Sequence, residues 1–137
     1  MDADTDDMPT PLRRWHEIVR DRDLSGLHGL LAEDARFHSP IVHRPQVGRV
    51  VTAMYLSAAC QVLLNDSFRY VREVVSGRNA VLEFLVEIDG IEINGVDMIR
   101  WNESGRIDDF KVMIRPLKAI ELIHRKMREM LAASTGA

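Results

Sequence analysis

Asp97 is the residue whose type and position most directly point to chemistry. Its neighbours predict a strand, and alternate side chains of a strand share a face, so Asp97 lies beside the apolar residues Ile99 and Trp101. Burying a carboxyl group is costly unless the group is paired, and burial raises its pKa. Asp97 is therefore interpreted as a pocket acid that donates a hydrogen bond to a carbonyl oxygen. The alternative is a structural role, with Asp97 bonded to Trp15 Nε1, a histidine or the backbone.

Two histidines are further candidates, since histidine is the usual proton carrier near neutral pH. His38 is a candidate base or proton shuttle, but strict strand alternation points it away from the face of Ser39 and favours a surface role. His43 lies in the loop expected at the pocket mouth, where it either contacts a ligand or is solvated. Without carboxylates at fitting positions these histidines form no metal site, so we expect neither a metal nor a cofactor. His124 is interpreted as structural.

The composition is that of an ordinary globular protein and limits the possible functions. The chain has 137 residues, a net charge of −3 and scattered basic residues, which argues against binding to nucleic acid. No apolar run is long enough to span a membrane, and the single cysteine, Cys60, excludes a disulfide framework. We therefore expect a cytoplasmic protein that binds a small molecule or serves as an interaction module.

Hydrophobic spacing predicts a disordered acidic tail, residues 1–8, and a single domain, residues 9–133. Thr10 is the expected cap of the first helix. The expected helices lie at residues 11–21, after Asp23 or Ser25, at 47–64 and at 116–133, and the expected strands at 35–39, 68–76, 80–88, 91–101 and 106–114. Asp89-Gly90 is a hairpin signal, and Gly105 is expected at positive φ in the next turn. The apolar stripe of the last helix is expected to comprise Leu117, Ile120, Ile123 or His124, Met127, Met130 and Leu131.

The predicted strands have one apolar face and one mixed face. Residues 82, 84, 86 and 88 are all apolar, whereas Glu83 and Glu87 lie opposite to them. The mixed face also carries Val96, Met98 and Met113, and its opposite charges on neighbouring strands can pair. This face is too apolar to be left to solvent alone.

This order of elements resembles the nuclear transport factor 2-like superfamily, in its SnoaL-like and ketosteroid isomerase branch. The resemblance rests on residues 23–27, 31–35 and 39–40, and on residues 96–101 with 105–107. It implies an α+β fold, a cone-shaped curved antiparallel sheet wrapped by N-terminal helices, with an extra C-terminal helix that covers the pocket mouth or a partner subunit. Relatives of this kind dimerise through the outer face of the sheet, so a homodimer with an isologous contact is expected.

The resemblance retains one of the three chemical groups of a ketosteroid isomerase. Asp97, with Arg100 and Trp101, matches the Asp-x-x-Arg-aromatic pattern of the acid that stabilises the enolate. Ser39, before Pro40, stands where the general-base aspartate is found, and Trp15 replaces the oxyanion-hole tyrosine. Loss of a positioned base costs roughly 100- to 10,000-fold in rate, which argues against ketosteroid isomerisation by the usual route. SnoaL-type polyketide cyclases use a single aspartate, which is compatible with Asp97 alone.

The resemblance thus implies a pocket for a small apolar carbonyl-type molecule, with an isomerase, cyclase or dehydratase activity that uses Asp97 as its acid. Tyr55 is near the position of a tyrosine that supports the oxyanion hole, and His38 is the candidate base. The alternative is a ligand-binding or dimerisation domain without catalysis. The expected ligand-binding residues are Trp15, Ser39, His43, Phe84, Ile99, Trp101, Phe110 and Val112.

Overall fold

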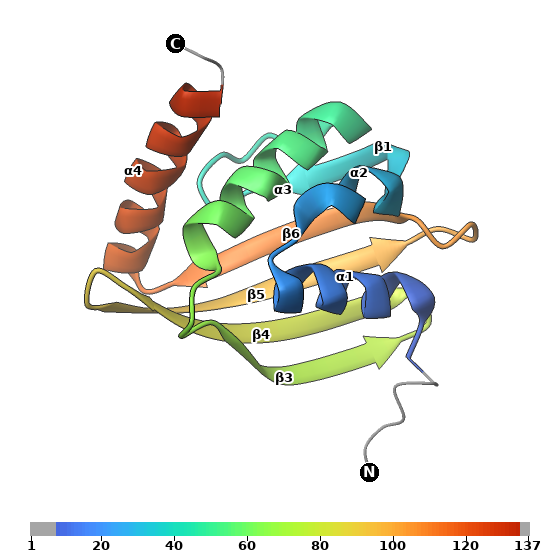
Figure 1. The fold of residues 1–137 in the computed structure, drawn as a ribbon, viewed down its shortest axis with the longest axis horizontal. Helices are drawn as coiled ribbons and strands as arrows, with labels where there is room; N and C mark the ends of the chain where they lie inside the picture. Colours follow the sequence, from blue (N-terminus) through green and yellow to red (C-terminus); the bar gives the residue numbers. More distant parts are fainter. Residues whose placement is uncertain (1–7, 135–137) are drawn as a thin grey trace.

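A curved six-stranded sheet carries three helices on one face and a fourth at one end (Figure 1). The computed structural model describes residues 8–134. Its helices are α1 (Thr10–Asp21), α2 (Leu27–Leu30), α3 (Arg49–Leu63) and α4 (Leu117–Ser134), with a 3₁₀ turn at Leu24–Gly26. Its strands are β1 (Leu31–His38), β2 (Gln46–Val47), β3 (Arg69–Ser76), β4 (Asn79–Ile88), β5 (Ile91–Trp101) and β6 (Ile107–Arg115). The predicted α+β cone with an extra C-terminal helix is confirmed.

The sheet is mixed rather than wholly antiparallel. Its strand order is β2-β1-β6-β5-β4-β3, and the four long strands β3 to β6 form the predicted antiparallel meander. β1 pairs in parallel with β6, which no local pattern indicated, because the two strands are far apart in the sequence. This pairing brings Phe37 opposite Phe110 and places the end of β1 beside the middle of the last strand.

The hairpin turns between the long strands have the backbone conformations that their residue types favour. Asp89 and Gly90 have φ of 53° and 78°, the two positive values of a type I′ hairpin turn. Gly105 has φ of 78°, as predicted, and the Asn102 side-chain oxygen accepts hydrogen bonds from the Ser104 and Arg106 backbone N–H groups. These turns set the register of β4, β5 and β6 and so place Asp97.

The N-terminal part differs from the prediction in detail. Thr10 does not cap α1, since its hydroxyl accepts a hydrogen bond from Arg13 instead. β1 begins four residues earlier than expected, because Leu31 already pairs with Ile107 of the sheet. Of the predicted disordered tail, residues 1–7 lie outside the described residues, and Met8 is half-buried against the core.

The described residues share one hydrophobic core between the sheet and its helices. α4 packs on α3 and on the ends of β5 and β6, but with a face rotated from the predicted stripe. Ala119, Leu122 and Ile123 are buried, whereas Leu117 is 69% exposed. Within the described part of the chain, none of the helices has the length and apolarity needed to cross a membrane.

Candidate functional site

Asp97 points into the core from the middle of β5. Its neighbours across the sheet are Leu82 on β4 and Val112 on β6, and it is only 6% exposed. Among the described residues the only other buried polar side chain is Thr52, whose hydroxyl is bonded to the Ala35 carbonyl. Thr52 is therefore explained by helix packing, while Asp97 requires a different explanation.

A chain of hydrogen bonds connects Asp97 to the first helix through Tyr70. The Trp15 Nε1–H group donates to the Tyr70 hydroxyl oxygen at 3.0 Å, and the Tyr70 hydroxyl donates to Asp97 Oδ2 at 2.5 Å. None of the hydrogen bonds among the described residues reaches Asp97 Oδ1. The second oxygen of the carboxyl group is therefore the one that can bond to a ligand.

The surroundings of Asp97 place its pKa near neutrality. Burial raises the pKa of Asp97 from its ordinary value of 3.8 to about 7, and the hydrogen bond from Tyr70 acts in the opposite direction. Burial, followed by the nearby Asp97, raises the pKa of Tyr70 well above 10. Burial likewise raises the pKa of the neighbouring Cys60 thiol to about 12. Tyr70 and Cys60 thus keep their protons, and Asp97 is the group here that exchanges one near neutral pH.

Asp97 lines a small chamber of about 30 Å³ whose walls are aromatic and aliphatic. The Phe84 ring stacks on Phe68 at a centroid distance of 5.1 Å, and Trp15 packs edge-on against Phe110 at 4.8 Å. A water molecule needs roughly 10–15 Å³ of such volume, so the chamber admits one or two small groups. It can receive a carbonyl oxygen but not a whole organic ligand.

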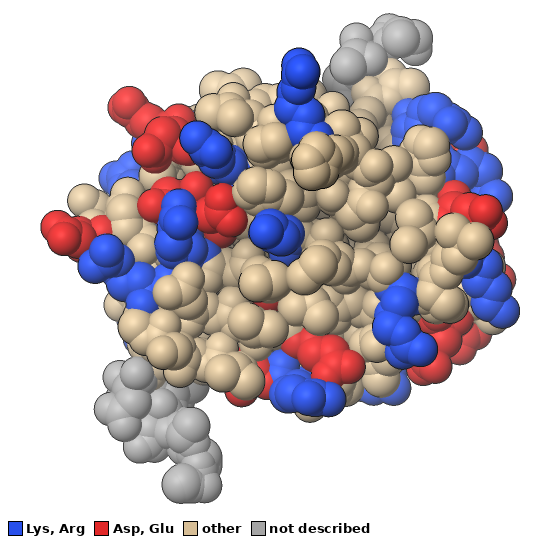
Figure 2. Space-filling model, turned by 180° about the vertical axis from the view of Figure 1, so that it is seen from behind, with Lys and Arg blue, Asp and Glu red and all other residues tan. Residues whose placement is uncertain are grey.

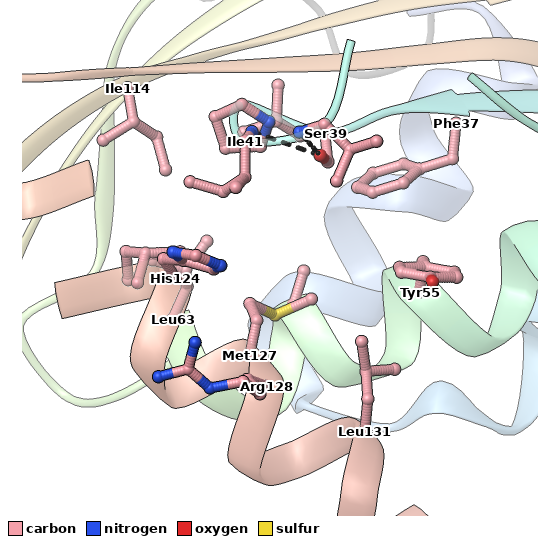
Figure 3. A pocket seen from close by; sticks show the side chains of 15 residues that line it. Phe37, Ser39, Ile41, Tyr55, Leu63, Ile114, His124, Met127, Arg128 and Leu131 are labelled. Atoms are coloured by element: carbon pink, nitrogen blue, oxygen red, sulfur yellow. Dashed lines mark hydrogen bonds between the residues drawn. The ribbon is translucent and has the colours of Figure 1, made fainter. Parts of the chain in front are cut away.

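A larger cavity of about 260 Å³ adjoins the chamber. Ala59, Leu63 and Val112 line both spaces. The walls of this cavity are mostly apolar, and the polar side chains among them belong to Ser39, Tyr55, His124 and Arg128. Figure 3 shows Tyr55 projecting from α3 and Met127, Arg128 and Leu131 from α4 around this space. α4 therefore covers the cavity of its own chain.

The sequence of residues 12–110 matches the model of the SnoaL-like domain family. The chain belongs to this family. No protein of curated function matches it. Solved structures that resemble this SnoaL-like domain include a steroid delta-isomerase from Pseudomonas aeruginosa, with 41% identity, a TM-score of 0.87 and 93% of both chains covered. Another is an uncharacterised protein with a cystatin-like fold from Silicibacter pomeroyi, with 35% identity, a TM-score of 0.78 and coverage of 93% of this chain and 86% of that one.

A more distant neighbour of the SnoaL-like domain shows the fold alone. It is an NTF2-like protein of unknown function from Mesorhizobium loti, with 20% identity, a TM-score of 0.69 and coverage of 85% of this chain and 97% of that one.

The structure divides the predicted site residues of the SnoaL-like domain among three places. Trp15, Phe84, Phe110 and Val112 line the chamber of Asp97, and Val112 also lines the larger cavity, together with Ser39 and Tyr55. Ile99 and Trp101 are buried in the core and line neither space. His38 and His43 line neither space and instead border a shallow surface hollow with Lys111 and Met113.

The candidate base, His38, is not brought to Asp97. His38 Nε2 lies 2.9 Å from Asp109 Oδ1, on the outer side of the sheet, as strand alternation indicated. The Ser39 hydroxyl oxygen accepts hydrogen bonds from the Ile41 and Val42 N–H groups and so holds the turn after β1. The position of the missing base is thus occupied by a residue with a structural task.

Sequence reasoning missed Tyr70, His124 and Arg128. Tyr70 is 27 residues from Asp97 in sequence, and the bulge after it in β3 hides the alternation that would have marked it as inward-facing. The stripe of the last helix left Ile123 and His124 as alternatives, and the structure places both on the cavity. The described residues contain no group of three or more potential metal-ligating side chains.

Proposed function

We propose that the cone binds a small apolar molecule with a carbonyl-type oxygen, and that this oxygen bonds to Asp97 Oδ1. The observation that carries the proposal is the Trp15–Tyr70–Asp97 chain, which ends in a free carboxyl oxygen inside an apolar chamber. Tyr70 occupies Oδ2, so the proton of a neutral Asp97 is available to the ligand on Oδ1. In a water-poor site, such a donor stabilises the negative charge that develops on a carbonyl oxygen.

The proposed reaction class is proton transfer next to a carbonyl, as in an isomerase, cyclase or dehydratase. A pKa of about 7 lets Asp97 give and take a proton near neutral pH, where acid catalysis is most effective. A structure 41% identical to this chain is described as a steroid delta-isomerase, which supports a carbonyl ligand. The cavity of about 260 Å³ lies near the lower end of ligand pockets and favours a compact ligand.

A specific observation favours a second candidate, binding without turnover. Ser39 holds a turn and His38 pairs with Asp109, so neither supplies a base next to Asp97. A carbonyl compound would then be held by the acid but not deprotonated. The two candidates differ in one measurable event, the exchange of the hydrogen α to the carbonyl.

The test follows a compact apolar ketone, tetralone, by NMR in deuterated buffer. The enzyme candidate is supported if the wild-type protein binds tetralone and accelerates exchange of its α-hydrogen, and if the Asp97→Asn variant loses this acceleration. Binding that is weakened by Asp97→Asn, without accelerated exchange, supports the second candidate. Asp108→Asn is the matched control, since Asp108 lies on the neighbouring strand and pairs with Arg100 outside the cavity. Binding that is equal in wild type and Asp97→Asn would exclude both.

A further inference from the structure

The α4 side of the larger cavity carries two side chains that can hold an anion. His124 and Arg128 are four residues apart on α4 and both line the cavity. Side chains at this spacing lie next to each other on one face of a helix. Figure 3 shows both residues on the α4 wall, with Met127 between them in sequence and Leu131 on the following turn. One helix face thus presents a guanidinium and an imidazole beside apolar side chains.

Neither side chain is engaged within the described residues. His124 and Arg128 form no hydrogen bond or ion pair there, whereas the nearby Lys126 is paired with Asp89 at 3.1 Å. No acidic side chain of the described residues lines the cavity. The charge of Arg128 therefore has no counter-charge at the wall, which otherwise consists of residues such as Ile114 and Ile123.

We infer that the ligand of the cavity is an apolar carboxylate, with its hydrocarbon body in the cavity and its carboxylate on Arg128 and His124. A guanidinium presents two parallel N–H groups that match the two oxygens of a carboxylate, and an imidazole N–H adds a third donor. The apolar walls accept a hydrocarbon body, and the other polar side chains of the lining, Ser39 and Tyr55, carry no charge. The inference rests on the proposed function for the place of the hydrocarbon body.

The two proposals together define the ligand as an apolar oxo acid. Its carbonyl oxygen lies in the chamber at Asp97, which borders the larger cavity at Ala59, Leu63 and Val112. Its carboxylate lies at α4. The hydrocarbon between the two polar ends lies along the apolar wall of the larger cavity.

The test compares naphthylacetate with naphthylacetamide, a neutral molecule of nearly the same shape, by isothermal titration calorimetry at low ionic strength. Wild type is expected to bind the carboxylate about 5-fold more tightly than the amide, because His124 and Arg128 are both exposed and solvent weakens an ion pair at such a position. Arg128→Gln should remove most of this preference and His124→Gln part of it, while affinity for the amide stays within about 3-fold. Raised salt should weaken binding of the carboxylate alone.

Arg125→Gln is the matched control, because Arg125 is exposed on the same helix and does not line the cavity. Equal affinity for carboxylate and amide, failure of the carboxylate to bind, or the same loss in Arg125→Gln and Arg128→Gln would overturn the inference. Failure of the two proposals can be told apart. If only the anion site is wrong, the carboxylate preference is absent but tetralone binding still depends on Asp97. If only the proposed function is wrong, tetralone binding does not depend on Asp97 but the carboxylate preference remains.

Discussion

The hydroxyl group of Tyr70 limits how far burial raises the pKa of Asp97. Burial alone favours the neutral carboxyl group, and the hydrogen bond that Tyr70 donates favours the charged one. The balance places the pKa of Asp97 at about 7, where both protonation states are populated near neutral pH. Trp15 contributes indirectly, since its N–H group holds the Tyr70 oxygen and so orients the hydroxyl towards Asp97.

The raised pKa of Asp97 predicts a loss of stability as pH rises. Below about 3.8 the carboxyl group is protonated in both states; between 3.8 and about 7 the unfolded chain ionises while the folded protein retains its proton. The free energy of unfolding should then fall by up to about 1.4 kcal/mol per pH unit relative to an Asp97→Asn variant, which cannot ionise. Urea unfolding of both proteins at several pH values measures this difference, with Asp108→Asn as the control for loss of a carboxyl group. Parallel curves for wild type and Asp97→Asn would contradict the prediction.

At the scale of the strand, a glycine makes room for the wall of the chamber. Gly95 on β5 lies directly opposite Phe84 on β4. A Cβ atom added to Gly95 would lie 2.2 Å from Cζ of Phe84, well inside contact distance. The ring of Phe84 therefore lies across the bare backbone of Gly95, and this position lets it stack on Phe68 beside Asp97.

Gly95→Ala should therefore destabilise the protein and disturb the chamber. Displacing a packed ring typically costs about 1–3 kcal/mol, and the Phe84 ring has to leave the chamber wall. Urea unfolding measures the stability, and tetralone affinity measures the chamber. Gly29→Ala is the control, because a Cβ atom there meets nothing within 4 Å and should be neutral or slightly stabilising. Adding Phe84→Leu to Gly95→Ala should recover part of the lost stability, because the smaller side chain leaves room for the new Cβ atom. A Gly95→Ala variant as stable as the wild type would contradict the prediction.

Local pattern predicted the meander well because each of its signals lies within a few residues. The strand 91–101 is observed as Ile91–Trp101, since its alternation and its Asp89-Gly90 turn are both local. Asp97 was placed on the inner face for the same reason. The start of the second long helix was placed two residues early, because Val47 pairs with Arg36 in β2 and only then does Gly48, at φ 115°, lead into α3.

Features that depend on distant contacts could not be predicted this way. The parallel pairing of β1 with β6 and the bond from Tyr70 to Asp97 join segments remote in sequence. The rotation of α4 was not determined by its sequence, because its apolar residues occupy more than one face and packing on α3 selects Leu122 and Ile123. A glycine at position 95 between inward-facing residues was the available signal for a close approach.

At the scale of the whole molecule, the outer face of the sheet is open and only partly polar. Figure 2 shows this face from behind, with broad uncharged areas between scattered charged groups. Val74, Val81 and Met113 are 56%, 36% and 49% exposed, and Val96 and Met98 are half-buried between them. Two charged pairs of this face are formed within the sheet itself, Arg72 with Glu83 and Arg100 with Asp108, while Lys111 lies opposite Met98.

We propose that two copies of the chain associate through this outer face in an isologous dimer, so that the exposed valine and methionine side chains of one copy cover those of the other. In such a dimer, a double variant with Val81→Lys and Met113→Lys would bury four unpaired charges, and its dissociation constant should rise about 100-fold or more. Sedimentation velocity over a concentration series measures this change. Val50→Lys is the control, because Val50 is 76% exposed on α3, on the opposite side of the sheet. A wild-type protein that sediments as a monomer at all concentrations, or a double variant as dimeric as wild type, would rule the outer face out; dissociation caused by Val50→Lys alone would instead place the contact on the helical side.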